Sequence, residues 1–135
     1  MRQVEVSKFV AAPPVVVQRE LTPTSVVEFE GSFEVQEVTK TEAGAVVTAS
    51  AGGLTIELVF EDHETGLTYR QRGETGPFDA METTVSVVSE NEGSRVTTRS
   101  EVSLGLPVAG LTDRVAAWKR RGELERSLDR LAEQL

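Results

Sequence analysis

Polar side chains recur among aliphatic residues in the middle of this chain, always at every second position. Side chains two residues apart on a strand share a face, so these residues are predicted to point into one interior. Buried polar groups need hydrogen-bond partners, which either a ligand, water or one another can supply. Hydroxyls and one amide among aliphatics could orient an amphiphilic small molecule. The alternative is that threonine merely replaces valine on these strands. The set comprises Tyr69, Gln71, Thr83, Thr98 and Ser100.

The sequence contains none of the common catalytic motifs, such as a nucleophile elbow, a phosphate loop, a dinucleotide fingerprint or a His-Glu-x-x-His pair. Tyr69, Gln71 or Glu74 could move a proton in an enzyme, although Glu74 has outward parity. His63, the only histidine, lies between two acidic residues at an expected hairpin. Without a second histidine or a cysteine it is interpreted as a surface residue. We therefore expect no metal and no cofactor, and assign no general base.

Composition limits the remaining classes. The 135 residues suit one domain, 1–135, and 39% hydrophobic with 27% charged residues is typical of a folded protein. The absence of cysteine excludes disulfides and thiolate chemistry. With 22 acidic and 14 basic residues the net charge is -8, which disfavours nucleic acid and suggests a salt-rich cytoplasm. No signal peptide or membrane-spanning segment is expected. Monomer and dimer both stay open.

The pattern of secondary structure changes once, near residue 105. Before it, valine and threonine recur with period two between glycine-containing breaks, which indicates strands joined by hairpins and therefore an antiparallel meander. Two short helices follow the first strand. The second is capped either by Thr22 before Pro23, or by Ser25 with Glu28, and ends at Gly31. The predicted strands are 4–10, 32–41, 45–51, 54–62, 67–75, 78–90 and 94–104, and the short helices are 14–21 and 22–31.

A long C-terminal helix, 111–135, is the clearest single element. Its length of roughly 36 Å would cross a whole sheet. One apolar stripe runs through Leu111, Val115, Trp118 and Gly122, and a second, rotated stripe holds four leucines. Trp118 is interpreted either as a core anchor or as the wall of a pocket in which Gly122 leaves room. The run Lys119-Arg120-Arg121 is interpreted as a solvated face, or as a contact for an acidic partner.

Strand parity predicts which residues face the interior. The row that begins with Phe33 and Val35 loses its parity at Glu37 and Val38, which indicates a bulge. Lys8 shares the inner face of the first strand, whereas Arg95, Arg99 and Glu101 should face solvent. The other predicted inner residues are Leu54, Ile56, Leu58, Phe60, Leu67, Tyr69, Gln71, Gly73, Met81, Thr83, Val85, Val87, Val96, Thr98, Ser100, Val102 and Leu104.

This order of elements resembles the START-like (SRPBCC) superfamily of polyketide cyclases, lipid-transfer domains and pollen allergens. The stretch from Val4 to Pro13 is similar to the family's first strand and Ala-Pro helix start, and the spacing of Leu124, Leu128 and Leu131 is similar to its last helix. Val16-Val17 departs from the aromatic residue frequent there. The resemblance implies an α+β helix-grip fold, in which a seven-stranded antiparallel sheet wraps a long C-terminal helix around an apolar cavity.

The resulting hypothesis is a protein that binds or transports a lipid, quinone or polyketide-like molecule between sheet and helix. Two alternatives stay open: a cyclase or dehydratase that uses the same cavity, and a cochaperone-type interaction module with a filled core. The candidate ligand-binding residues are Phe33, Ile56, Leu58, Phe60, Tyr69, Gln71, Met81, Thr83, Thr98, Ser100, Leu111, Val115, Trp118 and Gly122.

Overall fold

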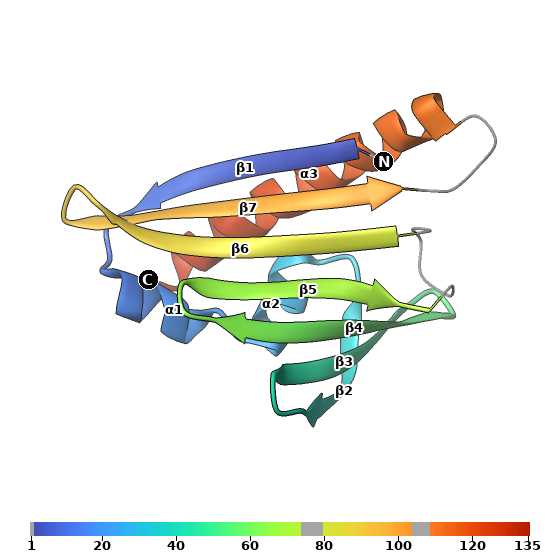
Figure 1. Cartoon of the computed structure of the whole chain (residues 1–135), viewed down its shortest axis with the longest axis horizontal. Helices are drawn as coiled ribbons and strands as arrows, with labels where there is room; N and C mark the ends of the chain where they lie inside the picture. Colours follow the sequence, from blue (N-terminus) through green and yellow to red (C-terminus); the bar gives the residue numbers. More distant parts are fainter. Residues whose placement is uncertain (1, 74–79, 104–108) are drawn as a thin grey trace.

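The computed structural model describes residues 2–73, 80–103 and 109–135, with only the backbone of 109–112. Seven strands and three helices follow one another in the predicted order (Figure 1). The elements are β1 (Arg2–Val10), α1 (Pro14–Glu20), α2 (Pro23–Glu30), β2 (Glu34–Lys40), β3 (Gly44–Ala51), β4 (Leu54–His63), β5 (Gly66–Arg72), β6 (Ala80–Glu90), β7 (Gly93–Ser103) and α3 (Ala109–Glu133).

The strands form one antiparallel sheet in the order β1-β7-β6-β5-β4-β3-β2. Strands β2 to β7 form the predicted meander, and β1 pairs with β7, so that β1 and β2 are the two edge strands of the sheet. The register shifts between Val35 and Glu37, where the loss of parity predicted a bulge. The helix-grip fold expected from the resemblance is therefore confirmed.

Helix α2 begins with a reciprocal cap. The Thr22 hydroxyl accepts a hydrogen bond from the Ser25 backbone N–H at 3.1 Å, and the Ser25 hydroxyl accepts one from the Thr22 N–H at 2.9 Å. This is the first of the two predicted caps, so the alternative with Ser25 and Glu28 is wrong. Gly31 ends the helix at φ 77°, a left-handed conformation that glycine adopts without a steric penalty.

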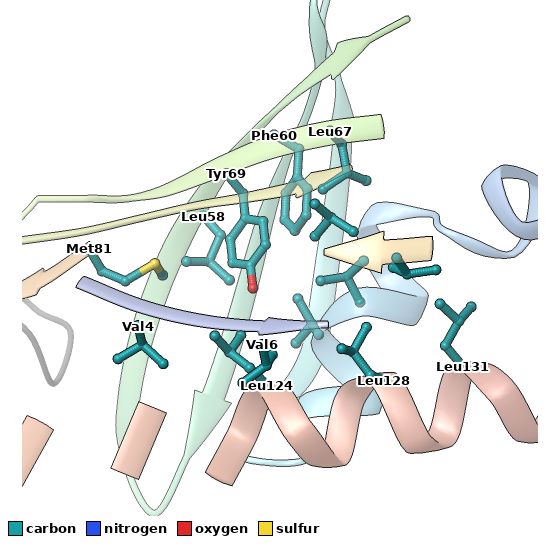
Figure 2. Packing of buried hydrophobic residues seen from close by; sticks show 14 of the residues in the cluster. Val4, Val6, Leu58, Phe60, Leu67, Tyr69, Met81, Leu124, Leu128 and Leu131 are labelled. Atoms are coloured by element: carbon teal, nitrogen blue, oxygen red, sulfur yellow. The ribbon is translucent and has the colours of Figure 1, made fainter. Parts of the chain in front are cut away.

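Helix α3 covers the part of the sheet formed by β1 and β7, and packs beside α2 (Figure 1). Its leucine stripe points at the sheet, with Leu124, Leu128 and Leu131 buried against the strands (Figure 2). Helix α2 packs over β2 and β3. The helices thus lie on one face of the sheet, which is the face that parity predicted to be buried.

Most inner-face predictions are confirmed, since Ile56, Phe60, Leu67 and other residues of the same parity are buried. Leu54 and Gly73 are corrections, because both are exposed, Leu54 to 38%. Leu54 follows the Gly52-Gly53 turn at the start of β4, and Gly73 comes just after β5. Parity fixes the side of a sheet, but at the ends of strands it does not ensure cover. Leu104 and Glu74 lie outside the described residues.

The structure also shows where the charged residues and the histidine of the predicted strands lie. Lys8 lies on the helix side of β1, where its ammonium pairs with Asp129 of α3 at 3.2 Å and keeps partial contact with solvent. Arg99 and Glu101 are exposed and Arg95 is partly exposed, as predicted. His63 is exposed, and its Nε2 lies 2.8 Å from the Thr68 hydroxyl. Within the described ranges, no group of three or more potential ligands could hold a metal ion.

Candidate ligand-binding site

The face that α3 turns to the sheet differs from the predicted one. Trp118 is 78% exposed, Val115 is 58% exposed, and Gly122 is also on the outside. Their predicted inward orientation is wrong, and the side chain of Leu111 lies outside the described residues. The physical reason is that the leucine stripe fixes the helix rotation. One and two turns before Leu124, the inward positions are Arg120 and Ala116, both of which are buried.

Arg120 is the centre of the site, because its side chain is only 2% exposed and every N–H of its guanidinium has an acceptor. The predicted solvated run is therefore wrong at this residue, although Lys119 and Arg121 are exposed. Five donors in a fixed plane require acceptors from several directions. Nε donates to Ser100 Oγ (3.1 Å), Nη1 to Glu30 Oε1 (2.5 Å) and Glu123 Oε1 (3.3 Å), and Nη2 to Tyr69 Oη (2.6 Å) and Thr83 Oγ1 (2.9 Å).

The sheet supplies three of these acceptors from a single row. Tyr69 on β5 pairs directly with Thr83 on β6, and Thr83 pairs with Ser100 on β7. Directly paired residues have neighbouring side chains, so the register alone brings three hydroxyls together. The Thr83 and Ser100 hydroxyls lie 2.8 Å apart. Figure 2 shows the Tyr69 hydroxyl pointing from the sheet towards α3. The Tyr69 ring stacks on the ring of Phe60, with 4.7 Å between the two ring centroids.

Two carboxylates complete the cluster. Glu30 ends α2 and accepts hydrogen bonds from Arg120 and from the Tyr69 hydroxyl. Glu123 lies one helical turn after Arg120, and accepts from Arg120 and from the Ser32 hydroxyl. Lys119 approaches Glu123 Oε2 at 3.8 Å from the solvent side. The cluster therefore ties α2, the segment after it and α3 to the sheet.

Burial and charge fix the protonation of two groups. Burial raises the pKa of the Tyr69 phenol far above its ordinary value; Arg120 opposes this shift and Glu30 adds to it. Burial alone would lower the pKa of the Arg120 guanidinium, but Glu30 and the other acceptors raise it above its ordinary range. Tyr69 is therefore a neutral phenol and Arg120 a cation near neutral pH.

A pocket lies against this cluster, between the sheet, α2 and α3. The space open to the centre of a water molecule is about 30 Å³, enough for about two waters. Its apolar lining comes mostly from the sheet, and its polar lining consists of the cluster residues and Gln71 of β5. It is lined by Val27, Glu30, Ser32, Phe33, Ile56, Leu58, Gln71, Met81, Arg120 and Glu123.

The sequence-predicted candidates divide into three groups in the structure. Phe33, Ile56, Leu58, Gln71 and Met81 line the pocket. Four others are buried beside it: Tyr69, Thr83 and Ser100 as partners of Arg120, and Phe60 stacked on Tyr69. Thr98 is buried in the sheet, paired with Val6 and Val85.

The third group faces outward: Trp118 and Gly122 line a groove on the outer side of α3, together with Lys119 and Arg126. Ser32 and Glu123 line both this groove and the pocket. Val115 is exposed on the same helix.

Sequence reasoning missed Glu30, Ser32, Arg120 and Glu123. The available signal was periodicity, because Arg120 and Glu123 lie four and one positions before Leu124 and continue the leucine stripe. Counting only apolar residues placed the stripe's first half on the wrong side of the helix. Glu30 and Ser32 flank the Gly31 cap, and no sequence pattern connects them to a residue about 90 positions later.

The sequence matches, over residues 1–135, the family described as polyketide cyclase / dehydrase and lipid transport. A search of curated proteins gave no match. No helix in the described part of the chain has the length and apolar character needed to cross a membrane.

Similar folds occur in several solved structures. TTHA0849 from Thermus thermophilus is 23% identical, with 98% of this chain and 95% of that chain covered and a TM-score of 0.73. XoxI from Bacillus cereus is 19% identical, with coverages of 99% and 95% and a TM-score of 0.76. A START superfamily protein from Mycobacterium smegmatis is 14% identical, with coverages of 98% and 97% and a TM-score of 0.71. The chain therefore belongs to the polyketide cyclase/dehydrase and lipid transport family and has its START-like fold.

Proposed function

We propose that this protein binds or carries a small hydrophobic or amphiphilic molecule in the pocket between the sheet and α3. The observation that carries the proposal is an ionic cluster around the buried Arg120 at one side of a pocket whose other lining residues, except Ser32 and Gln71, are apolar. An apolar wall accommodates hydrocarbon, and a few fixed polar groups orient the ligand. The family's description, which includes lipid transport, supports the same class of ligand.

A purely structural role explains the cluster less well. Replacing a buried ion pair by apolar residues of similar volume is often neutral or stabilising, so such a pair is weak evidence for stability. Here one guanidinium and two carboxylates lie beside a cavity lined by Ile56, Leu58 and Met81. Polar groups at such a position are available to a ligand that replaces the water.

The pocket must widen to accept a ligand larger than about two waters. Met81 is unbranched and rotates easily, and Phe33 is only partly buried where it packs against the core. We propose that these two side chains move aside for the ligand. A filled core, as in an interaction module, would instead leave them in place.

Native mass spectrometry tests the proposal directly. The protein is isolated in high salt from the organism that makes it, and the same sample is extracted with organic solvent. We expect a stoichiometric added mass that disappears on denaturation and reappears in the extract. A bare mass, together with an unchanged melting temperature in a panel of lipids and quinones, would contradict the proposal.

A matched pair of variants locates the site. Ile56→Phe fills the pocket from β4 and should abolish the added mass. Val59→Phe places the same ring on the outer face of the same strand, where Val59 is partly exposed, and should keep it. Retention of the ligand by Ile56→Phe would place the site elsewhere. Once the compound is identified, turnover assays on it with Tyr69→Phe and Gln71→Leu test the enzyme alternative.

A further inference from the structure

In the polar wall of the pocket, the charged donors are already hydrogen-bonded to protein atoms, whereas some acceptors are still available. All five N–H groups of Arg120 donate to protein atoms, and the hydroxyls of Ser32 and Tyr69 donate to the two carboxylates. Two carboxylates offer about eight lone-pair sites in total. Glu123 accepts two of these hydrogen bonds, from Arg120 and Ser32, so acceptor capacity is left beside the cavity.

The charge of the side chains at the pocket also favours a ligand that donates hydrogen bonds. The buried carboxylate of Glu123 and the partly buried carboxylate of Glu30 face one buried guanidinium, so these three groups together are negative by one charge when both acids are ionised. Three further cations, Lys119, Arg121 and Arg126, line the outer groove on α3, which shares Ser32 and Glu123 with the pocket. All three are exposed, so water screens their charge, including that of Lys119, 3.8 Å from Glu123. A further anion brought into this pocket would be desolvated next to two carboxylates, and Arg120, the one cation among the described lining residues, has no N–H left to receive it.

From this inventory we infer that the pocket selects ligands whose polar end donates hydrogen bonds, an alcohol or an amine, and excludes carboxylates such as fatty acids. The inference rests on the proposed function and specifies its ligand class. The hydrocarbon part of the ligand packs on Ile56, Leu58 and Met81, and its hydroxyl or ammonium group donates to Glu123. Gln71, also in the wall, is neutral and does not change the sign of the field.

The test uses three ligands with one eight-carbon chain: octan-1-ol, octylamine and octanoate. Titration calorimetry and NMR shifts of the Ile56 and Leu58 methyl groups report binding to the intact protein at neutral pH. We expect octanol and octylamine to bind, because their polar ends can donate a hydrogen bond to a carboxylate. Octanoate instead brings a like charge, so we expect it to bind at least about tenfold more weakly, a difference in binding free energy of more than about 1.4 kcal/mol.

A matched pair of variants separates the pocket from the overall charge. Glu123→Gln should reduce the preference for octylamine over octanoate, whereas Glu125→Gln makes the same charge change on the exposed side of α3 and should leave it unchanged. Octanoate bound as tightly as octanol by the wild-type protein would overturn the inference and leave the proposed function standing. If none of the three ligands binds, both are overturned. The wild-type comparison decides even if Glu123→Gln does not fold.

Discussion

At the scale of single residues, Arg120 is a group on which polar contacts between the helices and the sheet converge. It joins β5, β6 and β7 to α2 and α3 through five hydrogen bonds. Such a network is sensitive to the loss of one member, because the groups left behind stay buried without their partner. The strongest effects of substitution are therefore expected here.

Arg120→Met should reduce the free energy of unfolding by about 3–5 kcal/mol, because it leaves the buried carboxylate of Glu123 and the partly buried carboxylate of Glu30 without their counter-ion. Urea unfolding measures this loss. Arg121→Met, at the exposed next position, should change stability by no more than about 0.5 kcal/mol. Adding Glu30→Gln and Glu123→Gln to Arg120→Met should restore part of the loss. Equal effects of Arg120→Met and Arg121→Met would contradict the buried cluster.

The raised pKa of Tyr69 predicts how the free energy of unfolding changes at alkaline pH. Its pKa is raised in the folded protein and close to 10 in the unfolded chain, so above pH 10 only the unfolded state loses the phenolic proton. The free energy of unfolding should therefore fall as the pH rises above 10, by up to about 1.4 kcal/mol per pH unit.

Because Tyr69 is the only tyrosine, phenolate absorbance reports this titration without interference from another phenol. The absorbance should rise only as the protein unfolds. Tyr69→Phe should show a shallower alkaline loss of stability. A phenol that titrates near pH 10 in the folded protein would show that Tyr69 is accessible to water.

At the scale of elements, the decisive feature is the rotation of α3 about its axis. The leucine stripe faces the sheet, which sends Arg120 inward and places Trp118 and Gly122 on the outside. The same rotation leaves space around Gly122, since a Cβ added there meets nothing within 4 Å. Glycine in an exposed helix interior has only its entropic disadvantage.

Gly122→Ala should therefore stabilise the protein by about 0.5–1 kcal/mol and leave ligand binding unchanged. Gly31→Ala is the contrasting variant and should destabilise it. Gly31 has φ 77°, and an added Cβ would lie 2.5 Å from Nη1 of Arg130. Thermal and urea unfolding measure both. Destabilisation by Gly122→Ala would mean that Gly122 packs against other residues, which would contradict the outward orientation described above.

At the scale of the whole molecule, the net charge of -8 acts against folding through repulsion among surface carboxylates. Salt weakens this repulsion, since the Debye length falls from about 10 Å at 0.1 M to about 3 Å at 1 M. We expect the melting temperature to rise with sodium chloride over this range. The double variant Glu37→Lys/Glu42→Lys reverses two exposed charges and should show a smaller rise. A melting temperature independent of salt in both proteins would contradict the prediction.

The sequence by itself determined the elements and their order. Period-two valines and threonines, the glycine-containing turns and the Thr22-Pro23 helix start are local signals, and local signals decide strands, hairpins and caps. Because short connections permit only antiparallel neighbours, the meander followed from them as well. Parity also placed Ile56, Leu58, Tyr69 and Met81 on the buried face.

Only the tertiary structure decided the site, because its members meet through packing between distant segments. Arg120 and Glu30 lie 90 positions apart, and they meet because α3 and α2 pack side by side on one face of the sheet. The rotation of α3 about its axis depends on the packing of the whole core. It buries Leu124, Leu128 and Leu131, and a charged residue comes inward with them because register across β5, β6 and β7 provides its acceptors. No pattern along the chain expresses that match.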